Sequence, residues 1–188
     1  MDREEVLRRS RAQLVLLRVR AQGECEVEIV PVGPLWLGSH WVDRRQILCT
    51  AGTDTPCELC GRSMSRVTGF VLAVVTQLER KRLMLLELSP LSWSGFEMSS
   101  RFEGVALDRG VITRLSRSSA RKPLRMEVVR AGGPLASVSE LEARLVNAVA
   151  VLFGIPLTQG SESIEEWRDR VTPFVARLAA IGAAKLKA

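Results

Sequence analysis

The feature that most constrains this chain is a group of metal-binding residue types within one short stretch. The chain has one histidine and four cysteines, and His40, Cys49, Cys57 and Cys60 follow the pattern H-x8-C-x7-C-x2-C. The C-x2-C pair is the most specific part, because two thiolates at that spacing on a tight turn can both reach one tetrahedral zinc ion at about 2.3 Å. The sequence therefore predicts a structural Zn²⁺ site formed by these four side chains.

Each of these residues also has a simpler interpretation. His40 could be a surface histidine, Cys49 a buried thiol at the start of a strand, and the C-x2-C pair a redox motif. The βαβ pattern expected around a thioredoxin-like motif is missing from the sequence, which argues against the redox interpretation. Cys25 lies between two glutamates in an alternating segment and is interpreted as structural, with replacement of His40 or Cys49 as a ligand left open.

The same stretch argues against catalysis. "PCELC" overlaps half of the zinc deaminase signature, but the other half requires H-x-E, and residue 42 is valine. A fourth protein ligand would close the metal against water, as in structural sites. The sequence also has no phosphate-binding glycine loop of P-loop form. We therefore expect a protein that is not an enzyme.

Hydrophobic periodicity predicts a mainly β region followed by helices. Strands are expected at 14–20 and 24–32, paired as a hairpin, and again at 67–75, 82–89, 110–117 and 123–130. A short helix is expected near the N-terminus, and residues 33–66 and 90–104 are expected to be irregular. About six strands with short links favour an OB-like small β-barrel or curled sheet, with the zinc loop 36–66 inserted into it.

The pattern changes after "AGGP" to two helical segments. Ser139 with Glu142, and Ser163 with Glu166, each match a capping box ahead of an apolar stripe with helical spacing. Pro173 is expected to kink or split the second helix. The predicted organisation is therefore an OB-like domain over residues 1–132 and a C-terminal helical region over 133–188.

The positive charge is unevenly distributed along the chain. The net charge is +6, and residues 101–130 alone carry eight Lys or Arg against three Asp or Glu. Such a basic segment favours an anionic partner. No apolar run is long enough to span a bilayer, and the charged N-terminus lacks the apolar core of a secretion signal. We therefore expect a cytoplasmic protein without a membrane partner, whose cysteines are thiols or metal ligands.

Aromatic and basic residues alternate through the predicted β region. Rings that stack on bases, beside arginines that hold phosphates, form the surface that binds single-stranded nucleic acid. Phe70, by contrast, sits within an apolar strand and is expected in the core. The residues predicted to contact DNA or RNA are Trp41, Arg44, Arg45, Arg62, Arg66, Trp93, Arg101, Phe102, Arg114, Arg117, Arg121, Lys122 and Arg125.

A resemblance to a known family rests on the metal residues. A β-strand run with an early His/Cys3 loop, carried here by His40, Cys49 and "CELC" at 57–60, resembles the single-stranded DNA-binding proteins of T-even phages. The likeness covers about residues 14–130. It implies an OB-fold with a structural zinc subdomain that binds single-stranded DNA. The gap between the histidine and the next cysteine is longer here, and the chain ends in helices instead of an acidic tail.

A second interpretation belongs to a different class. The zinc knuckle and the C-terminal helices could form a protein-interaction module, either with a partner protein or through self-association. The excess charge lies on predicted strands, not on predicted helices, and this favours nucleic acid. The expected function is therefore single-stranded nucleic-acid binding, most readily to DNA, with low sequence specificity.

Overall fold

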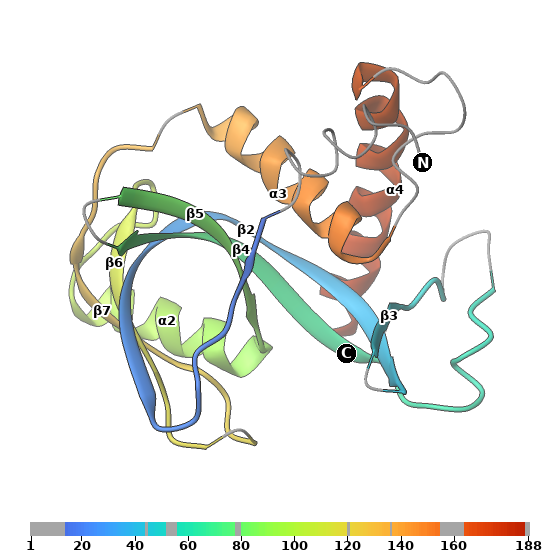
Figure 1. The fold of residues 1–188 in the computed structure, drawn as a ribbon, viewed down its shortest axis with the longest axis horizontal. Coiled ribbons are helices and arrows are strands. Elements are labelled where there is room, and N and C mark those ends of the chain that lie inside the picture. The colour runs from blue at the N-terminus through green and yellow to red at the C-terminus, as the bar shows by residue number, and fades with distance from the viewer. Residues whose placement is uncertain are drawn as a thin grey trace. The chain divides into compact units, whose positions relative to one another are not determined.

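The computed structural model describes residues 14–43, 45–51, 56–77, 80–119, 121–135, 137–154 and 164–186 (Figure 1). The chain divides into two compact units. Unit 1 comprises Met1–Leu14, Leu35–Thr68 and Ala143–Ala188, and unit 2 comprises Val15–Pro34 and Gly69–Glu142. This division differs from the predicted boundary at residue 132, because it groups the zinc loop with the C-terminal helices. The predicted N-terminal helix lies outside the described residues.

The strands confirm a mainly β protein with C-terminal helices. They form one seven-stranded sheet in the order β1-β5-β4-β2-β6-β7, with β3 paired to β2 off this path. The described strands leave this sheet open, so the predicted barrel is not found. The strand bounds are β1 Leu16–Leu17, β2 Gly23–Val42, β3 Arg45–Leu48, β4 Arg66–Gln77, β5 Arg80–Leu88, β6 Val111–Arg117 and β7 Arg125–Ala131.

The predicted strands of unit 2 are found as β4 to β7. Strand β4 pairs antiparallel with β5, from Gly69 opposite Leu88 to Gln77 opposite Arg80. Phe70 is fully buried, as predicted for the middle of an apolar strand. Strands β6 and β7 form the predicted antiparallel pair, with a register shift between Ile112 and Thr113. The continuous apolar run of β4 therefore identified a strand that is buried on both faces, whereas β6 and β7 alternate between buried and more exposed residues.

The predicted hairpin over residues 14–32 is wrong. Strand β1 has only two residues and pairs in parallel with β5, with Leu16 opposite Leu85. Strand β2 instead pairs antiparallel with β6, from Gly23 opposite Arg117 to Ile29 opposite Val111. Residues 21 and 22 do form a turn, as a hairpin between 14–20 and 24–32 would require. A local turn does not specify which distant strand each arm meets, because sheet pairing depends on tertiary packing.

Residues 90–104, expected to be irregular, contain helix α2 over Pro90–Phe102. Ser89 is its N-cap, because its hydroxyl accepts a hydrogen bond from the Ser92 N–H at 3.1 Å, and Pro90 occupies the first turn. Trp93 and Phe96 lie on its buried face, with Ser92 and Ser100. The helix was missed because buried serines weaken the apolar period on which the prediction relied.

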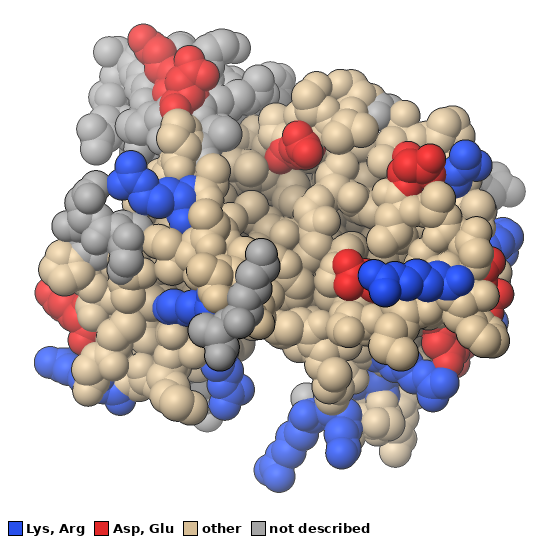
Figure 2. All heavy atoms as spheres, turned by 180° about the vertical axis from the view of Figure 1, so that it is seen from behind, with Lys and Arg blue, Asp and Glu red and all other residues tan. Residues whose placement is uncertain are grey.

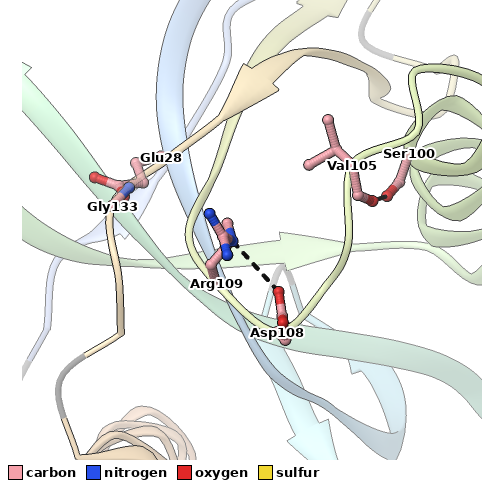
Figure 3. A network of polar contacts seen from close by, with 6 residues as sticks. All are labelled: Glu28, Ser100, Val105, Asp108, Arg109 and Gly133. Atoms are coloured by element: carbon pink, nitrogen blue, oxygen red, sulfur yellow. Dashed lines mark hydrogen bonds and ion pairs between the residues drawn. The ribbon is translucent and has the colours of Figure 1, made fainter.

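Helix α2 and several loops of unit 2 are fixed by polar contacts. The Ser99 hydroxyl accepts a hydrogen bond from the Val128 N–H of β7 at 2.8 Å, beside the register shift. Figure 3 shows the Glu28 carboxylate beside Gly133, whose N–H donates to it at 2.9 Å. The same view shows the Ser100 hydroxyl donating to the Val105 carbonyl, and the Asp108–Arg109 ion pair at 3.4 Å. The first three contacts satisfy backbone groups of Val128, Gly133 and Val105, and the fourth joins two exposed side chains.

Both predicted C-terminal helices are present, α3 over Val138–Leu152 and α4 over Ile164–Lys185. Helix α4 continues through Pro173 as one helix, so the expected split does not occur. In unit 1, Ala150 of α3 and Val175 of α4 are buried together, and Leu35 of β2 packs against them. Among the described helices, none combines the length and apolar character that crossing a bilayer requires.

Candidate metal centre

Two of the predicted ligands are positioned by a β-hairpin inside unit 1. Strand β3 pairs with the end of β2, with His40 opposite Ile47 and Val42 opposite Arg45. The Cys49 N–H then donates to the Gly38 carbonyl at 2.8 Å, which extends the pairing to the next ligand. His40 is fully buried and Cys49 is 4% exposed. Both side chains are therefore held by regular backbone structure.

The hairpin corrects the prediction that residues 33–66 are irregular. Strand β2 runs to Val42, so His40 lies on a strand and not in a loop. The glycines and proline near residues 33–38 hid the strand, because such residues usually mark turns. Asp43, at the turn, has φ of 49°, and Asp is among the residues that tolerate this left-handed conformation. That aspartate was the one local sign of a hairpin.

The other two ligands lie on a tight knuckle, as predicted from the C-x2-C spacing. The Cys60 N–H donates to the Cys57 carbonyl at 3.2 Å, which closes a turn around the pair. The N–H groups of Arg62 and Ser63 both donate to the Leu59 carbonyl, at 3.0 and 2.9 Å. This turn presents both thiols on the same side of the chain, toward the hairpin.

The hairpin and the knuckle bring the four predicted ligands together. One ligand atom from each of His40, Cys49, Cys57 and Cys60 lies within 4.8 Å of all the others. The Cys49 and Cys60 sulfurs are 3.6 Å apart, and His40 Nε2 lies 3.4 Å from the Cys57 sulfur and 3.6 Å from the Cys60 sulfur. Tetrahedral bonds of about 2.3 Å place two sulfurs roughly 3.8 Å apart, so these separations fit one metal ion.

Cys25 is not part of this group. It lies on β2 opposite Leu115 of β6, in unit 2, and its thiol is half-buried. Burial raises the pKa of the Cys25 thiol, and the charge of Glu24 raises it further. A thiol held in its protonated form is a poor metal ligand, because metals bind the thiolate. The structural interpretation of Cys25 is therefore consistent with its position.

A serine that the sequence did not single out orients the histidine. Ser63 Oγ lies 2.9 Å from His40 Nδ1, and the same hydroxyl donates to the Leu59 carbonyl at 3.4 Å. Because His40 Nε2 faces the thiols, the Nδ1–H donates to Ser63 when Nε2 binds a metal. Such an outer partner fixes the tautomer and the ring orientation of a histidine ligand. Nothing in the local sequence distinguishes Ser63 from the nearby Ser65 as a hydrogen-bond partner of the histidine.

The two knuckle thiols differ in acidity. Burial raises the pKa of Cys57, but hydrogen bonds from the backbone of Thr50, Leu59 and Cys60 and from the Cys60 thiol outweigh it and lower the pKa to about 6. Hydrogen bonding to Cys49 raises the pKa of Cys60 to about 11, with smaller contributions from burial and from Cys57. Because thiolates are the ligands, metal binding would release a proton from Cys60 near neutral pH.

A lysine distant in sequence also reaches the group. Lys185 Nζ, in the last turn of α4, lies 4.0 Å from the Cys49 sulfur and 3.4 Å from Ser65 Oγ. Lys185 and Cys49 are separated by 136 positions in the sequence. Sequence reasoning could not identify this contact, because it depends on how α4 packs in unit 1.

The residues predicted to contact nucleic acid divide between the two units. In unit 1, Trp41 is 55% exposed, and Arg45, Arg62 and Arg66 are exposed beside the metal loop. Arg44 lies outside the described residues. In unit 2 the predicted residues on the surface are Arg101, Phe102, Arg114, Arg121, Lys122 and Arg125, and Arg117 is half-buried.

The structure argues against one of these predictions and weakens two others. Trp93 is only 8% exposed and packs on Phe96 with a ring separation of 4.9 Å, so its ring is not available for stacking. Arg114 forms an ion pair with Glu24 at 3.0 Å, and Arg125 forms one with Glu127. On the face drawn in Figure 2, Lys and Arg side chains lie in several separate places, some beside Asp or Glu.

A comparison with protein-family models found no match, and searches among curated proteins and solved structures found no significant similarity. The functional argument therefore rests on the side chains of this chain and on their geometry.

Proposed function

We propose that this chain is a single-stranded nucleic-acid-binding protein stabilised by a structural zinc ion. The observation that carries the metal part is the convergence of one imidazole nitrogen and three sulfurs within 4.8 Å. Three soft sulfur ligands and one nitrogen in tetrahedral separation favour Zn²⁺ over hard cations such as Mg²⁺. With four protein ligands the site has no open position for water, so the ion would stabilise the fold and not catalyse a reaction.

The nucleic-acid part is supported by the surface around this centre. Trp41 directly follows the ligand His40, and half of its side chain faces solvent. A strand that is held by a metal presents such a ring without further loss of chain entropy. Arg45, Arg62 and Arg66 are exposed in the same unit and supply cations for phosphates. In this proposal the open sheet of unit 2 takes the place of the OB-like barrel.

The metal is tested by elemental analysis with a matched pair of variants. We expect one zinc ion per purified chain. Cys57→Ser should lose the metal and lower the melting temperature, whereas Cys25→Ser should keep both, because Cys25 lies outside the ligand group. Equal metal content in the two variants would rule out the proposed ligand set.

Nucleic-acid binding is tested by fluorescence anisotropy with a labelled single-stranded oligonucleotide. Trp41→Ala should weaken binding by about 1–3 kcal/mol, the usual contribution of one stacked base, and Trp41→Phe should restore most of it. Leu91→Ala, which removes an apolar side chain that is 69% exposed in unit 2 and was not predicted to contact nucleic acid, is the comparison variant and should bind like the parent. Binding should also weaken as salt rises, because phosphate contacts release counterions. Absence of binding at low salt would exclude this function.

One observation favours the alternative, a zinc-knuckle adaptor that binds a partner protein. Leu91, Met98 and Phe102 are 69%, 68% and 89% exposed on α2, and their spacing places them on one side of the helix. Exposed apolar side chains grouped in this way often mark a protein contact. If the anisotropy experiment finds no binding, this surface becomes the leading candidate for function.

A further inference from the structure

Packing in unit 1 fixes the last turn of α4 beside the candidate metal centre. Gly182 is buried against β2, and a Cβ atom at this position would overlap the Trp36 carbonyl oxygen and lie 3.2 Å from the Leu37 nitrogen. Val175 and Leu178 of the same helix are buried as well. The close approach at Gly182 leaves little freedom to the next turn, which carries Lys185. The ammonium group is therefore placed by packing and not only by its own flexible chain.

The charge of the proposed centre explains why a cation would be favourable there. A Zn²⁺ ion with three thiolates and a neutral imidazole has a net charge of −1. Part of that charge stays on the sulfurs, which accept hydrogen bonds from surrounding N–H groups. Lys185 Nζ lies 4.0 Å from the Cys49 sulfur, within reach of an N–H···S hydrogen bond. Ser65 Oγ, 3.4 Å from the same nitrogen, holds the ammonium group at this place.

We propose that Lys185 is an outer partner of the metal centre that donates to the Cys49 thiolate and compensates the negative charge of the loaded site. This inference rests on the proposed zinc site and extends it to a residue of the C-terminal helix. It makes metal binding and docking of the end of α4 mutually dependent. Because such coupling is reciprocal, docking of α4 increases the affinity for the metal, and the bound metal stabilises the docked position of α4.

The test compares the zinc affinity of the full chain in four forms by competition with a chromogenic chelator. Lys185→Met removes the charge but keeps an apolar side chain of similar length, and Lys185→Arg keeps the charge. Lys81→Met removes an exposed lysine from unit 2 as a control. We expect Lys185→Met to bind zinc about tenfold more weakly, as is common when an outer partner is lost. Lys185→Arg should stay close to the parent, and Lys81→Met should match it.

Salt separates a charge effect from a packing effect. The difference between parent and Lys185→Met should shrink when salt is raised from about 50 mM to about 1 M, because an ion pair near the surface is screened. A difference that persists unchanged at high salt would show that Lys185 acts through packing, and it would overturn the proposal. Circular dichroism checks that each variant is folded, and Lys185→Gln replaces Lys185→Met if that variant is not.

Hydrogen exchange supplies an independent readout of the coupling. In the parent, chelation should increase exchange in the C-terminal half of α4, and Lys185→Met should show a smaller increase. Equal zinc affinity in parent and Lys185→Met overturns this inference while leaving the zinc site intact. A parent chain that binds no zinc at all instead overturns the proposed function, so the two failures are distinguishable.

Discussion

At the scale of single residues, the structure separates what spacing can predict from what packing adds. The four ligands were predictable because the C-x2-C knuckle and the single histidine lie close together in the sequence, and ligand chemistry restricts the choice. Ser63 and Lys185 were not predictable in the same way. Their roles depend on a hydrogen bond to a ring that the fold orients and on a helix that returns from far along the chain.

For Trp93, the sequence pattern predicted an exposed ring that the structure places in the core. Its neighbourhood, rich in serine and glycine, suggested an exposed ring in an irregular segment. The helix signal from Ser89 and Pro90 was present in the sequence, and it places residue 93 on the face that packs with Phe96. A correct helix assignment would therefore have placed this ring in the core. Secondary structure has to be assigned before the exposure of an aromatic side chain is inferred.

A first prediction concerns Glu87, a half-buried carboxylate on β5 opposite Phe70. Burial raises its pKa above the ordinary value of 4.5, although the charges of Arg18 and Arg117 lower it in part. A raised pKa in the folded state means that stability is greatest while Glu87 is protonated and is lost as the pH rises through the folded pKa. Glu87→Gln should therefore be more stable than the parent at neutral pH, measured by urea unfolding.

The burial of Glu87 also predicts that the stability difference between Glu87→Gln and the parent depends on pH. The advantage of Glu87→Gln should disappear as the pH falls through the raised pKa of Glu87 to below the ordinary value of 4.5, because the parent carboxyl is then protonated in both the folded and the unfolded state. Glu24→Gln is the comparison, because Glu24 is 61% exposed and pairs with Arg114 at the surface. That change should lower stability by no more than about 1 kcal/mol. An advantage of Glu87→Gln that is constant with pH would contradict the argument from burial.

At the scale of elements, the strands of unit 2 and the pairing of neighbours joined by short links were predictable, but the partners of β1 and β2 were not. Strand β4 follows from local sequence because a strand covered on both faces needs a continuous apolar run. Strands β6 and β7 follow instead from their alternation of buried and more exposed residues. The partner of β1 is β5, which lies almost seventy positions later in the sequence. The hairpin of β2 and β3 was hidden by Gly33, Pro34 and Gly38. Residues that break strands in most settings are tolerated here by the surrounding structure.

A second prediction compares two helical glycines. A Cβ at Gly182 of α4 would overlap the Trp36 carbonyl, whereas a Cβ at Gly95 of α2 meets no atom within 4 Å. Gly182→Ala should therefore destabilise the protein, because the helix has to move away from β2. Gly95→Ala should stabilise it by about 0.5–1 kcal/mol, since alanine loses less backbone entropy than glycine in a helix. Thermal unfolding measures both.

The contrast between the two glycine variants tests the packing of unit 1. If Gly182→Ala also loses zinc affinity in the chelator competition, the fit of α4 against β2 supports the centre. An unchanged or higher melting temperature for Gly182→Ala would show that the helix does not pack on β2 as the structure has it.

At the scale of the whole molecule, the two units are assembled from interleaved segments. Unit 1 combines the end of β2, the metal loop and the C-terminal helices, whereas unit 2 takes the remaining strands and α2. Near residue 132 the hydrophobic pattern changes from strand-like to helix-like and the excess of positive charge ends. These two changes suggested a domain boundary there. The change coincides with the end of the last strand along the chain, whereas the two compact units have other boundaries.

A third prediction follows from this division. Removing the metal should loosen unit 1, whose hairpin, knuckle and α4 all meet at the ligand group, and leave the β4–β5 pair of unit 2 protected. Hydrogen exchange measured with and without a chelator should therefore increase in peptides from residues 35–68 and 164–186. Peptides from residues 80–88 should change little. A uniform increase over both units would mean that the metal supports the whole chain as one cooperative body.

The separation of 136 positions between Cys49 and Lys185 also determines the order in which the two residues are synthesised. A ribosome adds about 5–20 residues each second, so the ligands emerge several seconds before the helix that carries the lysine. During that interval the Cys49 thiol lacks the cation that would accompany it in the finished protein. Zinc captured early would be held less tightly than zinc in the completed chain. The last step in assembling this centre would then be the arrival of α4, and not the arrival of the metal.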